Sequence, residues 1–329
     1  MNYISGVMVD RSETFKDCGY PNIVIEQPLP KQIIYSGDFE HVVDKTAKNI
    51  IDRCKVEQKP IAILYSGGID STCVASAFLK QNQQIVILGS QASIDENPIF
   101  FNEVLCSNPN VILNIGNPLL FASQNSDKYI FVTGECGAHL MGTINWTKYG
   151  GREIENVDAV EADHMASSIF KNPEPFFNIP DDTKHRLLRI LDKSPKMFKT
   201  NYDAQWWSIF VLKWQFVSYR IQLWLGKLCP SFVNFFMTDD FQNWALYNDV
   251  TVKCPNYEWR NYKMPMRDYI YSYFPNRNAS YDMPKRMSMN RTYKNLSLKG
   301  RFVLDEPKKV GFMSVSEKLY CEDYLTHTF

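Results

Sequence analysis

The chain has 329 residues, of which 45% are hydrophobic and 22% charged, so it is long enough for one or two hydrophobic cores and is not a disordered chain. Its 36 Lys and Arg residues balance 36 Asp and Glu residues, and a formal net charge of zero does not favour bulk binding of nucleic acid or of a membrane surface. No apolar stretch approaches the roughly 20 residues that span a bilayer, and we expect neither a membrane span nor a signal peptide.

The chain begins with short apolar runs and turn residues, so residues 1–39 are predicted to form a short N-terminal β/turn segment. Between residues 40 and 56 the apolar side chains recur at helical spacing, which predicts an amphipathic helix. The apolar run at residues 61–64 predicts a strand, and a Ser-Gly-Gly turn then leads into a predicted helix at 71–80.

Further strands are predicted at residues 84–90, 110–115 and 128–135, with a helix at 97–106 between the first two. Strands that alternate with helices indicate an α/β fold with a parallel, doubly wound, Rossmann-like sheet. Ligands of such sheets lie at the carboxyl ends of the strands, where two glycine-bearing segments follow the predicted strands. We therefore assign an α/β core to residues 40–150.

The second half of the chain, residues 151–329, is predicted to be mainly helical and to form the substrate side. Its two longest helical patterns cover residues 182–195 and 202–228, and the second is rich in Trp and Phe. Aromatic residues at helical spacing are more typical of a core than of a base-stacking platform, so we expect them to be buried. Residues 275–329 show little periodicity and are expected to be an irregular, basic tail.

The eight cysteines are scattered along the chain without Cys-x-x-Cys spacing. That spacing is typical of zinc sites and dithiol redox sites, so neither is indicated. We expect reduced structural thiols in a cytoplasmic protein.

Residues 66–71 read Ser-Gly-Gly-Ile-Asp-Ser and stand between a predicted strand and a predicted helix. Glycines let a backbone approach a ligand closely, and a helix N-terminus offers free N–H groups to an anion, so this turn is typical of a phosphate site. It lacks the Gly-Lys-[Ser/Thr] of a Walker A loop and the Gly-x-Gly-x-x-Gly of a dinucleotide turn.

The turn resembles the PP-loop of N-type ATP pyrophosphatases, whose pattern is Ser-Gly-Gly-x-Asp-Ser, in the HUP-type superfamily of adenine nucleotide alpha-hydrolase-like proteins. The resemblance implies that ATP is split between its α and β phosphates, which adenylates a substrate and releases pyrophosphate. The turn and its two hydroxyls would hold the phosphates, the acid would bind Mg²⁺, and backbone at the strand ends would cover the adenine. The residues expected to bind ATP are Leu64, Ser66, Gly67, Gly68, Asp70, Ser71, Leu88, Thr133 and Gly134, with Asp70 as the Mg²⁺ ligand.

Two further segments resemble the synthetase domain of asparagine synthetases. Residues 131–142 are similar to its second glycine-rich signature, and residues 262–277 are similar to its Lys-x-x-x-Arg segment. The resemblance implies that Lys263 stabilises charge at the α-phosphate and pairs with Glu135. Arg267, one helical turn later, would lie on the same face and offer a second cation to phosphate.

The chain departs from that family at several positions. Ala138 stands where the family has a metal-binding Asp, so Mg²⁺ would need another ligand such as Asp95 or Glu96, and the neighbouring His139 is expected to be structural. The glutaminase domain of the family begins with a nucleophilic Cys at position 2, where this chain has Asn2, so we do not expect this chain to make ammonia from glutamine. We therefore expect the nitrogen donor to be ammonia or an amine made elsewhere.

Three hypotheses follow from these residues. The leading one is a stand-alone, asparagine-synthetase-like ligase that adenylates a carboxylate or amide of a small or macromolecular substrate, which ammonia or an amine then attacks. The second is a PP-loop enzyme that modifies a nucleobase in RNA or DNA, favoured by basic stretches at 193–199 and 285–301 but opposed by the zero net charge. The third is a non-catalytic nucleotide-binding protein with a decayed ligase site, favoured by Ala138 and opposed by the intact turn.

Overall fold

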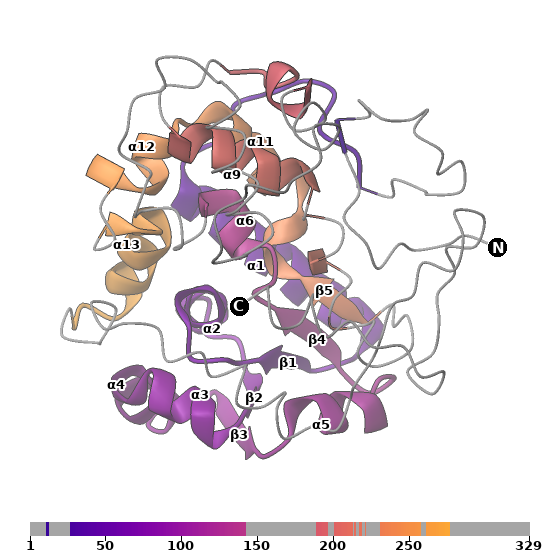
Figure 1. The fold of residues 1–329 in the computed structure, drawn as a ribbon. Helices are drawn as coiled ribbons and strands as arrows, with labels where there is room; N and C mark the ends of the chain where they lie inside the picture. Colours follow the sequence, from indigo (N-terminus) through magenta and orange to yellow (C-terminus); the bar gives the residue numbers. More distant parts are fainter. Residues whose placement is uncertain are drawn as a thin grey trace, which may run out of the picture.

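The computed structural model describes residues 11–12, 27–142, 189–196, 201–212, 214, 217–218, 221, 231–257 and 261–276. Within these residues the chain forms a five-stranded sheet in the order β3-β2-β1-β4-β5. Every neighbouring pair of strands is parallel, and helices cover both faces of the sheet (Figure 1). The predicted α/β, doubly wound parallel fold is confirmed.

The strands are β1 (Ile61–Leu64), β2 (Ile85–Gly89), β3 (Val111–Ile115), β4 (Ile130–Thr133) and β5 (Phe232–Asn234). The first four lie where the apolar runs predict them. β1, β2 and β4 are buried along their whole length, and a strand buried on both faces reads as a continuous apolar run, whereas β3 is an apolar run whose side chains are partly or largely exposed. The fifth was not predicted, since three residues carry almost no periodic signal. It pairs with β4, so the sheet also uses a strand from the part of the chain expected to lie on the substrate side.

The first two helices follow the prediction closely. Helix α1 (Phe39–Glu57) begins where the Asp38 carboxylate accepts a hydrogen bond from the His41 N–H, and α2 (Ile69–Lys80) begins directly after the Ser-Gly-Gly turn. The helix predicted at 97–106 consists of α4 and a π-helical turn. The remaining helices are α3 (Gln91–Glu96), α4 (Pro98–Phe100), η1 (Phe101–Leu105), α5 (Pro118–Gln124), α6 (Gly137–Met141), α9 (Asn201–Leu212), η3 (Phe235–Met237), α11 (Asp239–Tyr247), α12 (Val250–Lys253), η4 (Pro255–Tyr257) and α13 (Met264–Tyr273).

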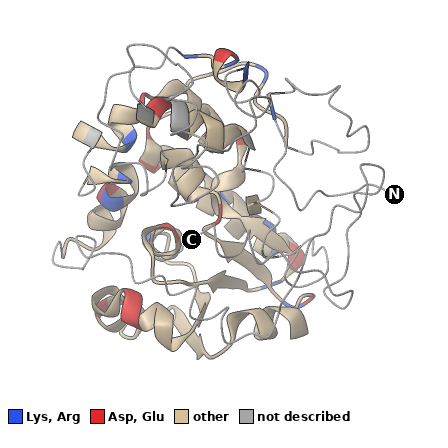
Figure 2. Ribbon diagram, viewed as in Figure 1, with Lys and Arg blue, Asp and Glu red and all other residues tan. Residues whose placement is uncertain are grey.

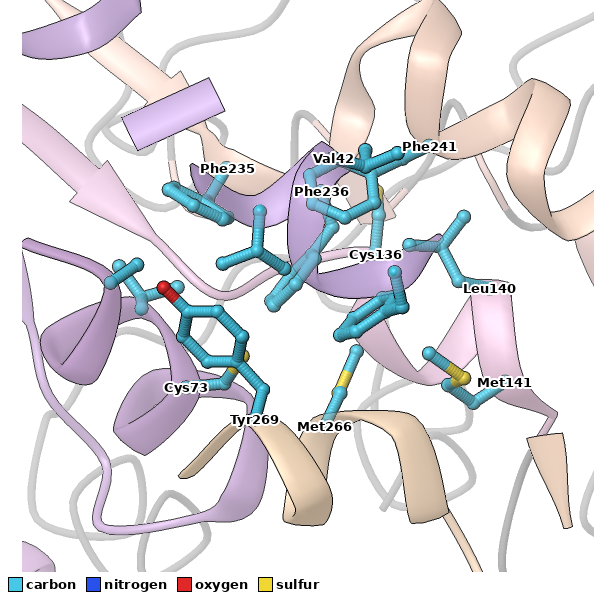
Figure 3. Close-up of a cluster of buried hydrophobic side chains, with 14 of the residues drawn as sticks. Val42, Cys73, Cys136, Leu140, Met141, Phe235, Phe236, Phe241, Met266 and Tyr269 are labelled. Atoms are coloured by element: carbon cyan, nitrogen blue, oxygen red, sulfur yellow. The ribbon is translucent and has the colours of Figure 1, made fainter. Parts of the chain in front are cut away.

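Two hydrophobic cores cover the two faces of the sheet. In β1 the side chains alternate, so Ile61 and Ile63 join the larger core with α1 and α2, whereas Ala62 and Leu64 join the smaller core with α5. The larger core extends between α2, α6 and α13, where the side chains in Figure 3 interdigitate. The described Trp and Phe residues of the 202–228 pattern are core residues as predicted, because Trp206, Trp207, Phe210 and Trp214 are all buried.

Of the expected N-terminal segment, residues 1–39, the structure describes residues 11–12 and 27–39. Residues 27–38 are irregular and form no strand, although residues 32–36 are apolar enough to suggest one. Ile34 and Tyr35 are 55% and 63% exposed. Residues 1–10 and 13–26, the first half of the helix predicted at 182–195 and the tail from 277 lie outside the described residues, and residues 189–192 are helical.

Charged residues of both signs are interspersed along the described ribbon, in agreement with the zero net charge (Figure 2). Each described helix is too short or too polar to pass through a bilayer. The cysteines in the described part of the chain carry free thiols, as expected. Burial raises the pKa of the Cys54 thiol to about 11 and that of Cys73 well above its usual range, so both are unreactive at neutral pH.

Candidate active site

The order of the strands identifies one crevice as the place for a ligand. From β1 the chain moves outward to β2 and β3, then returns to form β4 on the other side of β1. The direction of winding therefore reverses between β1 and β4, whose last residues, Leu64 and Thr133, are paired in register. In doubly wound sheets the ligand lies in the crevice at this switch point, beyond the carboxyl ends of the strands. Both glycine-bearing turns leave the sheet here.

The turn after β1 requires a glycine at its centre. Gly67 has φ +77°, a backbone conformation that side-chain-bearing residues seldom adopt, and a Cβ there would lie 2.2 Å from the Ser93 carbonyl oxygen. It would also lie 2.8 Å from Cβ of Glu96. The turn is thus pressed against α3, which was not predicted, and Glu96 is brought beside it.

The two serine hydroxyls brace this turn. Ser71 Oγ accepts a hydrogen bond from the Ser66 N–H at 3.2 Å and donates one to the Gly68 carbonyl at 3.1 Å. Ser66 Oγ lies 3.1 Å from Ser71 Oγ. Ser71 is buried, whereas Ser66 is partly exposed at the crevice. The hydroxyls expected to bind phosphate therefore also hold the shape of the turn.

The start of α2 suits an anion. Its N-cap is Gly68, and no side chain in the described part of the chain caps the first turn. The first N–H groups of a helix have no partner within the helix and carry the positive end of its dipole. A polyphosphate is the kind of group that such a glycine turn and helix start accept, so the donors present fit the phosphates of ATP.

The turn after β4 fits closely against the start of α2. A Cβ on Gly134 would lie 3.0 Å from the backbone C of Asp70, and a Cβ on Gly137 would lie 2.6 Å from the Asp70 Oδ1 atom. Only glycines leave room for this carboxylate. The structure therefore brings together the two motifs that the sequence analysis singled out, and Asp70 is the residue at which they meet.

Asp70 is held by a lysine from a distant part of the chain. Lys263 Nζ lies 2.5 Å and 2.6 Å from the two carboxylate oxygens of Asp70. The lysine side chain is 6% exposed and the aspartate side chain 26%, so the pair is largely screened from water but open on the aspartate side. Lys263 has left-handed backbone angles, φ 57° and ψ 36°, at the N-cap of α13. Such a conformation in a residue other than glycine costs about 1 kcal/mol and is typical of functional sites.

Arg267 lies one turn after Lys263 on α13 and is buried. The pKa of Tyr262 is raised well above its usual range by burial and by the Asp70 charge, while Arg267 acts in the opposite direction. Asp70, Tyr262 and Arg267 therefore lie within electrostatic reach of one another. Two buried cations, Lys263 and Arg267, therefore lie near the Asp70 carboxylate at the start of α2. The pairing of Lys263 with Glu135 stays a prediction, and Glu135 itself lies partly exposed in the turn after β4.

Side chains from the second half of the chain hold the far end of α6. Tyr202 donates to the Met141 carbonyl at 2.7 Å, Trp206 to the Leu140 carbonyl at 3.0 Å, and Tyr262 to the Gly142 carbonyl at 2.9 Å. At the other end of the turn, the Thr133 hydroxyl donates to Asn234 Oδ1 at 2.8 Å. Thr133 was expected to bind ATP, and its hydroxyl is bonded to Asn234, whereas the sequence analysis gave no role to Tyr202, Trp206, Tyr262 and Asn234. A buried Tyr or Trp usually needs a hydrogen-bond partner for its polar group, so the sequence indicates that such bonds exist. It does not indicate which carbonyl accepts them.

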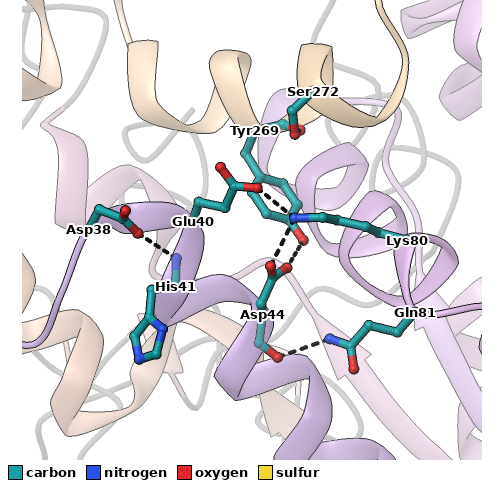
Figure 4. A network of polar contacts seen from close by, with 8 residues as sticks. All are labelled: Asp38, Glu40, His41, Asp44, Lys80, Gln81, Tyr269 and Ser272. Carbon is teal, nitrogen blue, oxygen red and sulfur yellow. Dashed lines mark hydrogen bonds and ion pairs between the residues drawn. The ribbon is translucent and has the colours of Figure 1, made fainter.

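A polar network fastens α13 to α1 and α2 away from the turn (Figure 4). Lys80 Nζ, at the end of α2, lies 2.6 Å from Glu40 Oε1 and 2.8 Å from Asp44 Oδ2. The Tyr269 hydroxyl of α13 donates to Asp44 Oδ1, and the Lys80 ammonium lies 4.9 Å from the centre of the Tyr269 ring. Burial, and then the bond to Asp44, raise the pKa of Tyr269 above its usual range. Helix α13 is thus anchored near both ends of α2, which fixes the position of Lys263.

The residues expected to bind a metal do not form a cage. The described residues contain no group of three or more His, Cys, Asp or Glu side chains placed to hold a metal ion. Both oxygens of Asp70 are bonded to Lys263, Asp95 accepts from Gln91 Nε2 at 3.0 Å, and Glu96 lies beside the turn at Gly67. Since Mg²⁺ is often held by one carboxylate and the phosphates of its nucleotide, these residues suit a metal that arrives with ATP. His139 is buried in α6, which agrees with a structural role.

The expected adenine-covering residues lie at the carboxyl ends of β1 and β2. Leu64 and Leu88 are paired in register, and the Leu88 carbonyl accepts a hydrogen bond from the Tyr65 N–H at 2.9 Å. The side chains of both leucines are buried in the smaller core. Their backbone, at the edge that carries both turns, is what a base could contact.

Comparison of the chain with models of known protein families, with curated proteins and with solved structures gives no match. A proposal on function therefore rests on the geometry of the site. The site consists of a glycine turn at the switch point of a parallel sheet, an open helix start, and a buried Lys263–Asp70 ion pair.

Proposed function

We propose that the protein binds ATP at the turn of residues 66–71 and is an AMP-forming ligase that adenylates a carboxylate or amide substrate. The observation that carries this proposal is the ion pair between Asp70 and Lys263, 193 positions apart in the chain, at the start of α2. A Gly-rich turn without a ligand has no need of a buried lysine aimed at its carboxylate. A helix start with a buried lysine and a buried arginine beside it, by contrast, suits a polyphosphate substrate and a transition state that gains charge at the α-phosphate.

The reaction would use the residues of this chain as follows. An oxygen of the substrate attacks the α-phosphorus of ATP, the bond to the β-phosphate oxygen breaks, and pyrophosphate leaves. Ammonia or an amine then attacks the adenylated carbon, loses a proton, and expels AMP. The turn N–H groups hold the β- and γ-phosphates, and Lys263 and Arg267 offset the charge that builds at the α-phosphate and at the tetrahedral carbon. Mg²⁺ bound with the ATP phosphates supplies further neutralisation of charge.

The test is a product assay with α-labelled ATP, Mg²⁺, ammonia and separate pools of small acids, tRNA and DNA. We expect the wild-type protein to form AMP and pyrophosphate with one pool. Asp70→Asn and Lys263→Met should each reduce the rate by about 100-fold or more, since each removes one member of a pre-organised charge pair. Asp52→Asn and Lys55→Met, which alter an exposed ion pair of α1, are the matched controls and should retain the wild-type rate.

Other outcomes separate the competing hypotheses. Formation of ADP would contradict cleavage between the α and β phosphates. Stimulation by tRNA or DNA alone would favour the nucleobase-modifying enzyme, and salt-dependent binding of the nucleic acid would support that result. ATP binding that Asp70→Asn weakens, without turnover in any pool, would indicate the non-catalytic nucleotide-binding protein.

A further inference from the structure

The outer edge of the sheet carries an uncovered apolar strand. β3 is the first strand in the sheet order, and the described part of the chain has no strand on its outer side. Ile112, Leu113 and Ile115 of β3 are 50%, 38% and 41% exposed, and Leu120 of the following helix α5 is 54% exposed. Exposed apolar residues gathered on one edge, unlike isolated ones, are typical of an interaction surface.

The sequence around this strand is free of charge. Residues 104–126 contain no Asp, Glu, Lys or Arg, although 22% of the whole chain is charged. Proteins usually protect an edge strand with lysines, prolines, a bulge or a covering helix, because its free N–H and C=O groups otherwise pair with another strand. Within β3 itself none of these protections is present. The backbone groups on the outer side of β3 are therefore suited to pair with another strand.

The hydrogen bonds to β2 show which backbone groups of β3 face outward. The Asn110 carbonyl accepts from the Ile85 N–H at 2.8 Å, and the Gly116 N–H donates to the Gly89 carbonyl at 2.8 Å. Bonding in a parallel pair alternates along the strand, so the even-numbered residues of β3 face β2. The N–H and C=O groups of Leu113 and Ile115 consequently point to the open edge.

We propose that a second copy of this chain pairs with this edge in the antiparallel direction, about a two-fold axis at Leu113. In that register Leu113 faces Leu113 of the partner subunit, and the outward N–H and C=O groups of these two residues bond to each other. Val111 faces Ile115 of the partner subunit, where the Val111 carbonyl accepts from the N–H of Ile115 of the partner subunit, while the Val111 N–H keeps its bond to the Asn108 carbonyl of its own chain at 3.0 Å and ends the ladder there. The sheet then runs through both subunits, with the Val111, Leu113 and Ile115 side chains of each copy on one face.

A second copy fits this edge better than an unrelated partner because the edge is complementary to itself. A two-fold interface places each residue opposite a residue of the same set, so any charge near the axis would meet its own sign. The uncharged stretch removes that repulsion entirely. It also leaves no charge pattern by which a different, charged partner would be selected.

The oligomeric state of the full-length protein tests this proposal. By sedimentation equilibrium we expect a dimer, and we expect Leu113→Lys to weaken it by about 100-fold or more, since two ammonium groups would face each other across the axis. Val56→Lys is the matched control, because Val56 is 84% exposed on α1, and it should remain a dimer. Circular dichroism of each variant should be unchanged.

A cross-link tests the register. In a Cys106→Ser background, which removes the exposed native thiol, Leu113→Cys should form a disulfide between subunits on oxidation. The two Cα atoms of a hydrogen-bonded antiparallel pair are about 5.5 Å apart, within the range of a disulfide. Ile112→Cys should not cross-link, because Ile112 faces Asn114 of the partner subunit. A monomeric wild type, a dimer unaffected by Leu113→Lys, or equal cross-linking at 112 and 113 would each overturn the proposal.

Discussion

The two turns at the switch point of the sheet are stabilised in opposite ways. The turn after β1 is held by its own residues, since Ser71 bonds to Ser66 and Gly68 within the same six positions. The turn after β4 and the helix α6 that follows it are held by distant side chains, among them Tyr202 and Tyr262. Asp70 joins the two turns through the space that Gly137 leaves open.

Because of this difference, we expect the two turns to tolerate amino-acid substitutions to different extents. A self-braced turn depends on a few residues of fixed type, so a change at one that sets its shape should remove both that shape and the proposed ATP binding. A turn held from outside shares its stability among several contacts, and the loss of one should lower stability while leaving the site recognisable. The following predictions test that contrast, beginning with the largest expected effect.

Gly67→Ala should abolish ATP binding. The new methyl group would meet the Ser93 carbonyl oxygen at 2.2 Å in a backbone conformation with φ +77°, so the turn must move away from α3. We expect a loss of stability of about 3 kcal/mol and at least a 100-fold loss of ATP affinity, measured by urea unfolding and by calorimetry. Gly68→Ala is the control, because its Cβ would meet nothing closer than Ser66 Oγ at 3.5 Å. Equal effects of the two substitutions would show that the close approach to α3 is not what the turn requires.

Tyr262→Phe should have a moderate effect, on stability more than on binding. It removes the donor to the Gly142 carbonyl and leaves that oxygen without this bond in a buried position. We expect unfolding to become easier by about 1–2 kcal/mol, with ATP affinity lowered less than it is by Ser71→Ala. The paired measurement of unfolding and affinity in both variants checks this. If Tyr262→Phe impairs binding more than Ser71→Ala does, the turn after β4 is the more important of the two.

The self-braced turn is also the part of the site that the sequence could predict. Strands β1 and β2 and helices α1 and α2 follow from apolar spacing, and the turn between β1 and α2 follows from its glycines and hydroxyls, because all of these signals are local. The resemblance to ligases pointed to Lys263 as a site residue, and it lies at the crevice with Asp70. Its observed partner was not predicted, since the Asp70 carboxylate reaches Lys263 only through the fold.

The elements that the sequence missed are short or depend on distant contacts. Strand β5 has three residues, and its place in the sheet is set by pairing with β4. The polar groups of Tyr202, Trp206 and Tyr262 are satisfied by the carbonyls at the end of α6, and no spacing rule connects a tyrosine with a carbonyl 61 or 120 positions away. The rings of Tyr202 and Trp206 were correctly expected in the core as part of the 202–228 pattern, but the role of the three side chains in holding the second turn was not predicted.

A buried lysine contacts Trp206, one of the side chains that hold the turn after β4, and the effect predicted for it is a change of stability with pH that is small over a single pH unit. Lys253 is fully buried, donates to the Ala245 carbonyl at 2.7 Å, and lies 3.4 Å from the centre of the Trp206 ring. Burial, and then the charge of Lys196, lower the pKa of Lys253 well below its usual range, against the weaker opposing charges of Asp203 and Asp249. The folded protein therefore binds fewer protons at this position than the unfolded chain does.

Because the unfolded chain keeps the ordinary lysine pKa of about 10.4, this group makes the fold more stable as the pH rises from the folded pKa toward that value. Lys253→Met keeps the apolar contact with Trp206 and removes the titrating group. As the pH rises, the unfolding free energy of the wild type should therefore increase relative to that of the variant, by at most about 1.4 kcal/mol per pH unit. Urea unfolding of both proteins between pH 7 and about 10 measures this difference, and the titrations of the tyrosines cancel in it. If the plots of unfolding free energy against pH were parallel for the two proteins, Lys253 would have the same pKa in the folded and unfolded states. Burying its ammonium group beside Trp206 would then carry no electrostatic cost.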